Sequence, residues 1–151
     1  MSAYTQDVVT AVRKGNLAVI KELHASGVQL HCANRYGESL VHMACRRGHV
    51  DVLRFLIEEV KCPLRVKDDF GRNPLHDALW SSEPNLELLE FLIDNDVDLF
   101  LIEDKRGHSP FSYIRRNHWT QWTNFLLERK EKLKLKTFIE PLATGQFLIQ
   151  G

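Results

Sequence analysis

A short block of sequence recurs three times in this chain at nearly constant spacing. Gly37, Gly71 and Gly107 open the three copies and lie 34 and 36 residues apart. The copies read Gly-Glu-Ser-Leu-Val-His, Gly-Arg-Asn-Pro-Leu-His and Gly-His-Ser-Pro-Phe-Ser. Periods of about 20–50 residues are typical of proteins whose repeated unit is one supersecondary element, too small to bury its apolar face alone. The spacing therefore predicts a solenoid in which each unit stacks on its neighbours.

Positions further along each copy recur as well. Ala44 and Ala78 lie two residues after the histidines, and a Leu-x-Phe-Leu pattern follows in residues 53–56 and 89–92. A degenerate first copy, without the glycine turn, lies 33 residues before the second. The sequence therefore predicts one domain of residues 1–136 with four units, at about 4–33, 34–67, 68–103 and 104–136.

Each copy also carries signals for the start of a helix. Ser39, Asn73 and Ser109 can each cap a helix, because a short polar side chain accepts a bond from the first free backbone N–H groups. Pro74 and Pro110 then fall at the first helical position, where a missing N–H costs nothing. Apolar residues at helical spacing follow on both sides of a glycine, which predicts two short antiparallel helices in each unit. Helices this short depend on packing for their stability.

This pattern resembles the ankyrin repeat, whose Thr-Pro-Leu-His-x-Ala core is matched by Asn-Pro-Leu-His-Asp-Ala at 73–78. The second unit has Ser-Leu-Val-His-Met-Ala, and the fourth departs most, with Ser-Pro-Phe-Ser. The resemblance covers about residues 4–130. It implies an all-α fold, an ankyrin-repeat solenoid of helix-turn-helix units joined by short β-hairpin-like loops. It also implies a concave surface, formed by the hairpin tips and the first helices, that binds a partner protein.

Histidines and cysteines in the second unit raise the question of a zinc site: His31, Cys32, His42, Cys45 and His49. Structural zinc motifs bring their ligands in close-spaced pairs, whereas His42 and His76 occupy the repeat's own histidine position. There the ring is expected to bridge backbone groups of neighbouring turns. The sequence has no convergent catalytic triad and no Gly-x-x-x-x-Gly-Lys phosphate loop. We therefore predict a protein that is not an enzyme and binds no metal or cofactor.

Composition bears on the location of the protein. No apolar run approaches the roughly 20 residues that a membrane span needs, and the first residues do not resemble a secretory signal. Three cysteines, an odd number without metal-like clustering, suit reduced thiols. We expect a cytoplasmic protein, either a monomer or a subunit of a hetero-complex. The basic residues within 128–136 leave a nuclear location as the alternative.

The chain has 20 basic and 20 acidic residues, but their distribution is uneven. Residues 81–104 contain eight acidic residues and no Lys or Arg, and most of this stretch belongs to the second helix of the third unit and its exit, which face away from the concave surface. The repeat register places basic and aromatic residues on that surface, and ten of them form the predicted partner-binding site: Arg35, Tyr36, Arg46, Arg47, Phe70, Arg72, Trp80, Lys105, Arg106 and Arg116. A basic face opposite an acidic back favours an acidic partner.

The leading hypothesis is thus a non-catalytic protein–protein interaction module, a scaffold or adaptor that binds an acidic partner segment. Tyr, Trp and Arg are the side chains that most often anchor interfaces. Nucleic-acid binding through the same groove is one alternative, although the pI of about 7.1 is low for such domains. An aromatic cage for methylated lysine is another, and it requires Tyr36, Phe70 and Trp80 to lie together. The charges could also serve solubility alone.

Residues 137–151 form a tail with neither repeat register nor helical periodicity. We expect this tail to cover the apolar edge of the last unit, because terminal repeats need a cap. A partner-docking strand and the start of a further domain are the alternatives.

Overall fold

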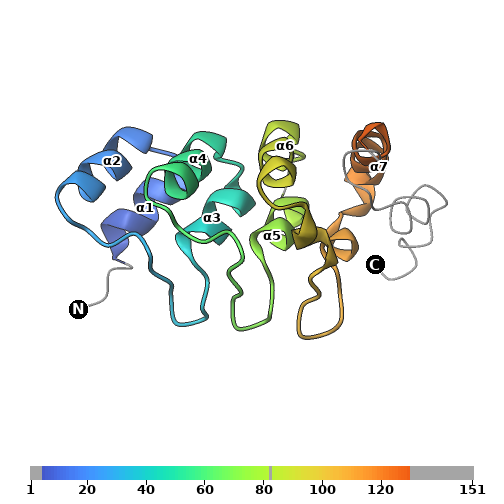
Figure 1. Cartoon of the computed structure of the whole chain (residues 1–151), viewed down its shortest axis with the longest axis horizontal. Coiled ribbons are helices and arrows are strands. Elements are labelled where there is room, and N and C mark those ends of the chain that lie inside the picture. The colour runs from blue at the N-terminus through green and yellow to red at the C-terminus, as the bar shows by residue number, and fades with distance from the viewer. Residues whose placement is uncertain (1–4, 82, 130–151) are drawn as a thin grey trace.

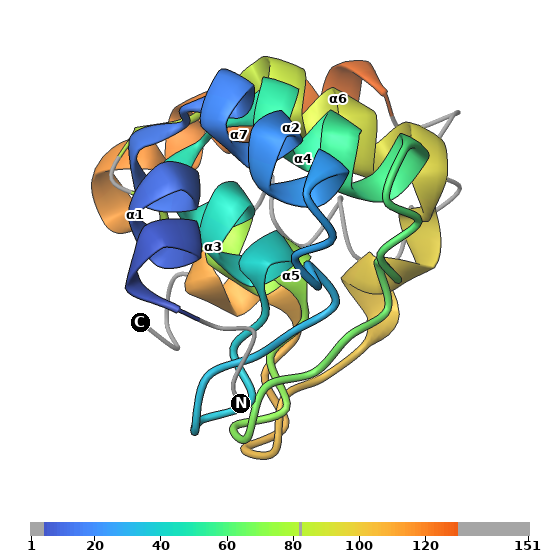
Figure 2. The same cartoon turned by 90° about the vertical axis from the view of Figure 1, so that its left-hand side faces the viewer.

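The chain forms two layers of short helices, stacked along one axis (Figure 1). The structure is a computed structural model that describes residues 5–81 and 83–129. One layer contains α1 (Gln6–Lys14), α3 (Leu40–Arg47) and α5 (Pro74–Trp80). The other contains α2 (Leu17–Ala25), α4 (Val50–Glu58), α6 (Leu86–Asn95) and α7 (Trp119–Glu128). Long loops between the helix pairs all project to the same side, as the end-on view in Figure 2 shows. The predicted all-α solenoid is confirmed.

The helix boundaries follow the signals in the sequence. The side chains of Ser39 and Asn73 accept backbone N–H groups in the first turns of α3 and α5, and Pro74 is the first residue of α5. Gly48 ends α3 in the left-handed conformation, with φ of 74°, so that α4 can begin two residues later and run back antiparallel.

The projecting loops are hairpin-like, as predicted, and they pack closely on one another. Gly37 and Gly71 have φ of 74° and 77°, which favours glycine. The backbone N–H of Lys105, in the next hairpin, donates to the carbonyl of Phe70 at 3.0 Å. A Cβ on Gly71 would lie 2.8 Å from the backbone nitrogen of Lys105, so a side chain there would push the two hairpins apart.

The fourth unit differs from its prediction. Ser109 makes no side-chain cap, and the expected first helix is replaced by two 3-10 turns, η2 (Pro110–Tyr113) and η3 (Arg116–His118). The backbone is extended at Ile114, which ends η2 after one turn. Ser112 also stands where the second and third units have the histidine that bonds back to the capping residue. α7 still completes the unit, because Trp122, Phe125 and Leu126 are buried in the core.

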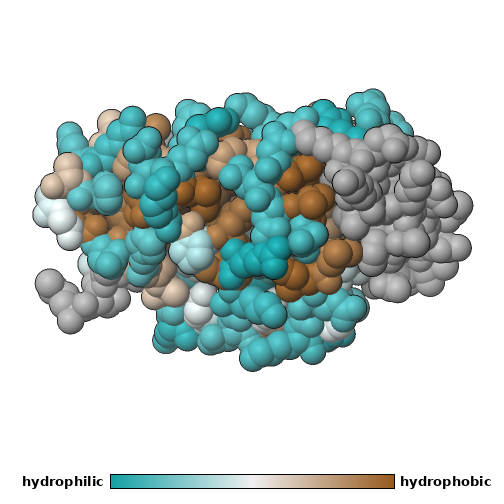
Figure 3. Space-filling view, in the orientation of Figure 1, coloured by the Kyte–Doolittle hydropathy of each residue, from teal (hydrophilic) through white to brown (hydrophobic). Residues whose placement is uncertain are grey.

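The core lies between the two layers and continues through every unit. Apolar side chains from both layers are fully buried there, including Val12, Ile20, Leu53 and Leu89. A further 3-10 helix, η1 (Val97–Leu101), leads from α6 into the last hairpin. On the face seen in Figure 3, hydrophilic residues cover the units and the hairpin tips, while hydrophobic residues show between the units.

Two predictions lie outside the described residues. One is the capping role of the tail at residues 137–151, and the other is the extent of the fourth unit beyond residue 129, which the sequence predicts to reach residue 136. Within the described part, α7 ends at Glu128.

Candidate functional site

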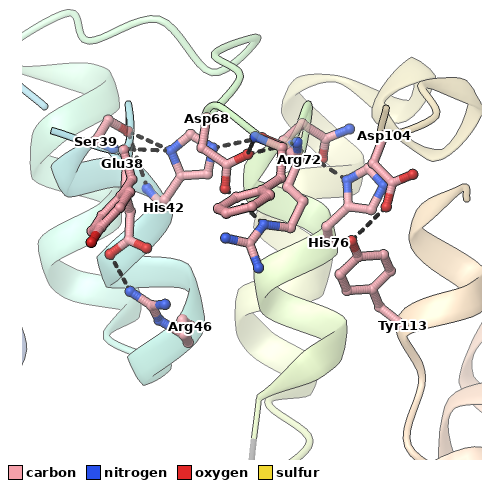
Figure 4. A network of polar contacts seen from close by, with 12 residues as sticks. Glu38, Ser39, His42, Arg46, Asp68, Arg72, His76, Asp104 and Tyr113 are labelled. Carbon is pink, nitrogen blue, oxygen red and sulfur yellow. Dashed lines mark hydrogen bonds and ion pairs between the residues drawn. The ribbon is translucent and has the colours of Figure 1, made fainter. Parts of the chain in front are cut away.

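Two buried histidines tie the first helices of the second and third units to the hairpins that follow. The Nδ1 atom of His42 accepts the backbone N–H of Ser39 at 3.1 Å, and its Nε2 donates to the carbonyl oxygen of Arg72 at 2.8 Å. His76 repeats both bonds one unit later, at 3.0 and 2.9 Å (Figure 4). Burial lowers the pKa of both rings, which favours the neutral form. The predicted bridging role is confirmed, and both ring nitrogens of each histidine are already engaged.

Buried carboxylates fix the shape of the hairpins. Asp68 accepts the backbone N–H groups of Phe70 and Arg72 at 2.9 Å each and the guanidinium of Arg72 at 2.7 Å. Asp104 holds the next hairpin in the same way and also accepts the hydroxyl of Tyr113 at 2.5 Å. Burial acts to raise the pKa of Asp104, but the hydrogen bonds from Tyr113 and the backbone lower it on balance. The tips are therefore held in place before any partner arrives.

The three predicted aromatic anchors are about half exposed. The exposed fractions of Tyr36, Phe70 and Trp80 are 48%, 55% and 49%. A guanidinium lies over each ring in a cation–π contact. The distances from the guanidinium carbon to the ring centroid are 5.0 Å for Arg35 and Tyr36, 4.8 Å for Arg72 and Phe70, and 4.3 Å for Arg115 and Trp80. Trp80 contacts the ring of Tyr113, and no ring contact in residues 5–81 and 83–129 joins the three anchors to one another. The three rings therefore do not pack together as one cage in the described residues, and each has an arginine beside it instead.

Two pockets flank Trp80 on the side of the first helices. We name the first the arginine pocket; it has a volume of about 420 Å³ and is lined by Arg13, Arg46, Arg47, His49, Trp80, Ser81 and Arg115. We name the second the tyrosine pocket; it has a volume of about 330 Å³ and is lined by Arg72, Trp80, Asp104, Arg106, His108, Ser112 and Tyr113. The predicted site is thus divided between the two pockets, with Trp80 lining both. Five of its predicted members line neither pocket: Arg35, Tyr36, Phe70, Lys105 and Arg116.

Three of the residues that line the arginine pocket occupy the same position of the repeat in successive units. Arg13, Arg46 and Trp80 follow one another at intervals of 33 and 34 residues. The sequence prediction missed Arg13, although the same register reaches it in the first unit. It also placed Arg116 at this position in the fourth unit, whereas Arg115 lines the pocket. The 3-10 turns that replace the fourth unit's first helix change the register there by one residue.

Arg115 is held firmly against Trp80. Its Nε donates to the backbone carbonyl of Trp80 at 2.7 Å while its guanidinium lies over the indole ring. On the other side, Nε2 of His49 donates to the carbonyl of Arg13 at 2.8 Å, which joins the end of α1 to the start of α4. Hydrogen bonds between units therefore fix two walls of the arginine pocket.

Acidic side chains of the same chain neutralise part of the positive charge on the basic surface. Arg46 forms an ion pair with Glu38, and Arg72 forms one with Asp68. Beneath them lies Asp77 on α5, which is only 4% exposed. Burial raises the pKa of Asp77 to about 7, against the opposing effect of the two arginines. Sequence reasoning did not find this acid, because nothing in the local pattern shows which polar positions of a short helix are buried.

The acidic stretch of residues 81–104 is also divided by the fold. Asp104 lies in a hairpin at the edge of the tyrosine pocket, so it is not part of an acidic back. Asp96 pairs with Arg65, and Glu90 pairs with Arg129. The predicted charge asymmetry between the two faces is therefore smaller than the sequence alone suggests.

The cysteines have the character of buried structural residues. Burial raises the pKa of Cys32 and of Cys62 to about 11, and it raises the pKa of Cys45 as well. Thiols with a raised pKa are poor nucleophiles and poor metal ligands at neutral pH. In residues 5–81 and 83–129, no group of three His, Cys, Asp or Glu side chains is placed to hold a metal ion. No helix in that part of the chain is long and apolar enough to span a membrane.

Comparison with known proteins agrees with this architecture. The family described as "Ankyrin repeats (3 copies)" matches residues 8–102. The chain is 33% identical over 107 residues to "Probable 26S proteasome regulatory subunit p28" of Saccharomyces cerevisiae, covering 69% of this chain and 46% of that protein. It is 31% identical over 97 residues to "Glutaminase liver isoform, mitochondrial" of Rattus norvegicus, covering 64% of this chain and 16% of that protein. The chain thus spans less than half the length of these relatives, and it belongs to the ankyrin-repeat family.

Proposed function

We propose that the chain is a non-catalytic adaptor whose concave surface binds an acidic segment of a partner protein. Ankyrin repeats are protein–protein interaction modules, and relatives of this chain include regulatory subunits of the proteasome. The observation that carries the proposal is the convergence of four arginines, from three repeat units, beside an exposed tryptophan. Arginine and tryptophan are enriched among the residues that dominate binding energies.

The arginine pocket has cationic side chains available for a partner. Arg13, Arg47 and Arg115 form no ion pair with a described residue, and the pocket lining contains no acidic side chain. Guanidinium groups bind carboxylates through paired, charge-assisted hydrogen bonds. The hydrogen bonds that fix Arg115 and the hairpins reduce the entropy that binding would otherwise cost. A partner segment would therefore lie across the ends of α1, α3 and α5, with its acidic side chains toward this pocket.

The location of the protein stays an expectation from the sequence. An adaptor of this kind would act in the cytoplasm, or in the nucleus as the alternative.

A direct test is fluorescence anisotropy with a labelled, glutamate-rich peptide at low and moderate salt. The double variant Arg13→Ala, Arg47→Ala removes two exposed guanidiniums without touching the core. We expect its affinity to fall by about tenfold or more, since a hydrogen bond to a charged group contributes roughly 1.5–3 kcal/mol. The matched control is Arg54→Ala, which removes an exposed arginine from α4 in the opposite layer. Equal affinities of the wild-type protein and the double variant would refute the proposed surface.

A further inference from the structure

The net positive charge at the arginine pocket exceeds the single negative charge of one carboxylate. Of its four guanidiniums, one is neutralised by Glu38. The ends of α1, α3 and α5 also lie at this pocket, and each helix end contributes about half a negative charge. About one and a half positive charges then remain from the arginines. A phosphate monoester carries about −1.5 to −2 charges at neutral pH, so it matches this excess, whereas one carboxylate does not.

We propose, building on the function above, that the arginine pocket binds a phosphorylated serine or threonine side chain of the partner segment. A guanidinium matches the two oxygens of a carboxylate with one pair of parallel bonds. Three guanidiniums without an ion pair to a described residue, from α1, α3 and the η2–η3 connection, suit a group with three acceptor oxygens. The pocket volume of about 420 Å³ leaves room for a phosphate and part of the flanking chain.

The surroundings of the arginine pocket favour serine or threonine over tyrosine. A phosphotyrosine ring that stacked on the same face of the Trp80 indole would compete with Arg115, whose guanidinium lies 4.3 Å from the ring centroid. Displacing Arg115 would also break its hydrogen bond to the carbonyl of Trp80. A short phosphorylated side chain can use Arg115 where it stands.

The neighbouring tyrosine pocket suits an anion less well, because Asp68 pairs with one of its two arginines, Arg72, and Asp104 offsets the other, Arg106. Its lining contains Asp104, whose lowered pKa keeps it ionised at neutral pH. Negative charge repels a phosphate. The phosphate site is therefore the arginine pocket alone, and the tyrosine pocket remains for a neutral or basic flanking residue of the same segment.

The test compares three short acetylated peptides that differ at one central residue: phosphoserine, glutamate or serine. Binding is followed by NMR, through the side-chain N–H signals of Arg13, Arg47 and Arg115 and the indole signal of Trp80. We expect the phosphoserine peptide to shift these signals and to bind about tenfold more tightly than the glutamate peptide, with the serine peptide weakest. A phosphotyrosine peptide should bind less tightly than the phosphoserine peptide.

Substitutions distinguish binding at the arginine pocket from non-specific electrostatic attraction. Arg47→Ala and Arg13→Ala should each weaken the phosphoserine peptide by about tenfold. Arg54→Ala, which removes an exposed arginine from α4 in the opposite layer, should leave its affinity unchanged. Equal losses in Arg47→Ala and Arg54→Ala would overturn the proposal, because they would indicate only long-range attraction.

The outcomes also distinguish this inference from the proposed function. Equal affinities for the glutamate and phosphoserine peptides, with shifts at the same arginines, would overturn the phosphate site while leaving the acidic-segment function standing. Failure to bind either peptide would overturn both. Tighter binding of a single-stranded oligonucleotide, with a steep salt dependence, would replace the phosphopeptide by nucleic acid. Tighter binding of vesicles that contain phosphoinositide would replace it by a membrane surface.

Discussion

Asp77 is a buried acid beneath the basic surface, and its replacement by asparagine makes a quantitative prediction. The pKa of Asp77 is raised from 3.8 to about 7 in the folded protein, chiefly by burial. Each unit of pKa difference corresponds to about 1.36 kcal/mol. The ionised carboxylate thus costs the folded state up to about 4 kcal/mol, an upper bound that structural relaxation will reduce.

The sign of the effect follows from which state holds the proton. Between pH 4 and 7 the folded protein keeps Asp77 protonated while the unfolded chain does not, so this residue makes the free energy of unfolding fall as the pH rises. Above pH 7 both states are ionised and the contribution is constant. His42 and His76 act in the opposite direction, because their lowered pKa values make stability rise as the pH rises through 6.5. Only a comparison with Asp77→Asn isolates the acid.

The assay is urea unfolding of the wild-type protein and Asp77→Asn at a series of pH values. We expect Asp77→Asn to become more stable relative to wild type by up to about 1.4 kcal/mol per pH unit between pH 4 and 7. The difference should then level off above pH 7. The histidine contributions cancel in this comparison because both proteins contain them. A difference that does not vary with pH, or a variant that is less stable than wild type at pH 8, would refute the reasoning.

Two further predictions concern the contacts between units. His42→Ala should lower the free energy of unfolding by about 3 kcal/mol, because it removes a buried ring and leaves the carbonyl of Arg72 and the N–H of Ser39 without their partner. Thermal denaturation measures this change in stability. A loss below about 1 kcal/mol would contradict the prediction. Gly71→Ala should cost about 2–3 kcal/mol, from its left-handed backbone and from the contact with Lys105. Gly27→Ala is the matched control, since its φ is also positive but a Cβ there would meet nothing within 4 Å. Equal losses at the two glycines would show that hairpin packing contributes nothing.

The sequence predicts the fold well because the repeat depends on a few local signals. The spacing of Gly37, Gly71 and Gly107, with the capping residues and prolines, is enough to predict paired helices and projecting hairpins. The role of His42 and His76 follows from the same register. These features repeat because each unit must contact the next in the same way.

The candidate site is less predictable, because it depends on side-chain contacts between units. Arg46 and Arg72 belong to the predicted surface, but their pairing with neighbouring acids appears only in three dimensions. Arg115 takes the position predicted for Arg116 because the fourth unit forms 3-10 turns where a helix was expected. The burial of Asp77 also depends on the packing of α5 against α3, which no local pattern encodes.

Cross-linking mass spectrometry on the protein purified with its partners from its own cells tests the central claim most directly. We predict cross-links between an acidic or phosphorylated segment of a partner and residues around the arginine pocket. Partner recovery should be lost in the variant Arg13→Glu, Arg47→Glu and retained in the control Arg54→Glu. Cross-links confined to the layer of α2, α4 and α6, or equal recovery with both variants, would contradict the account.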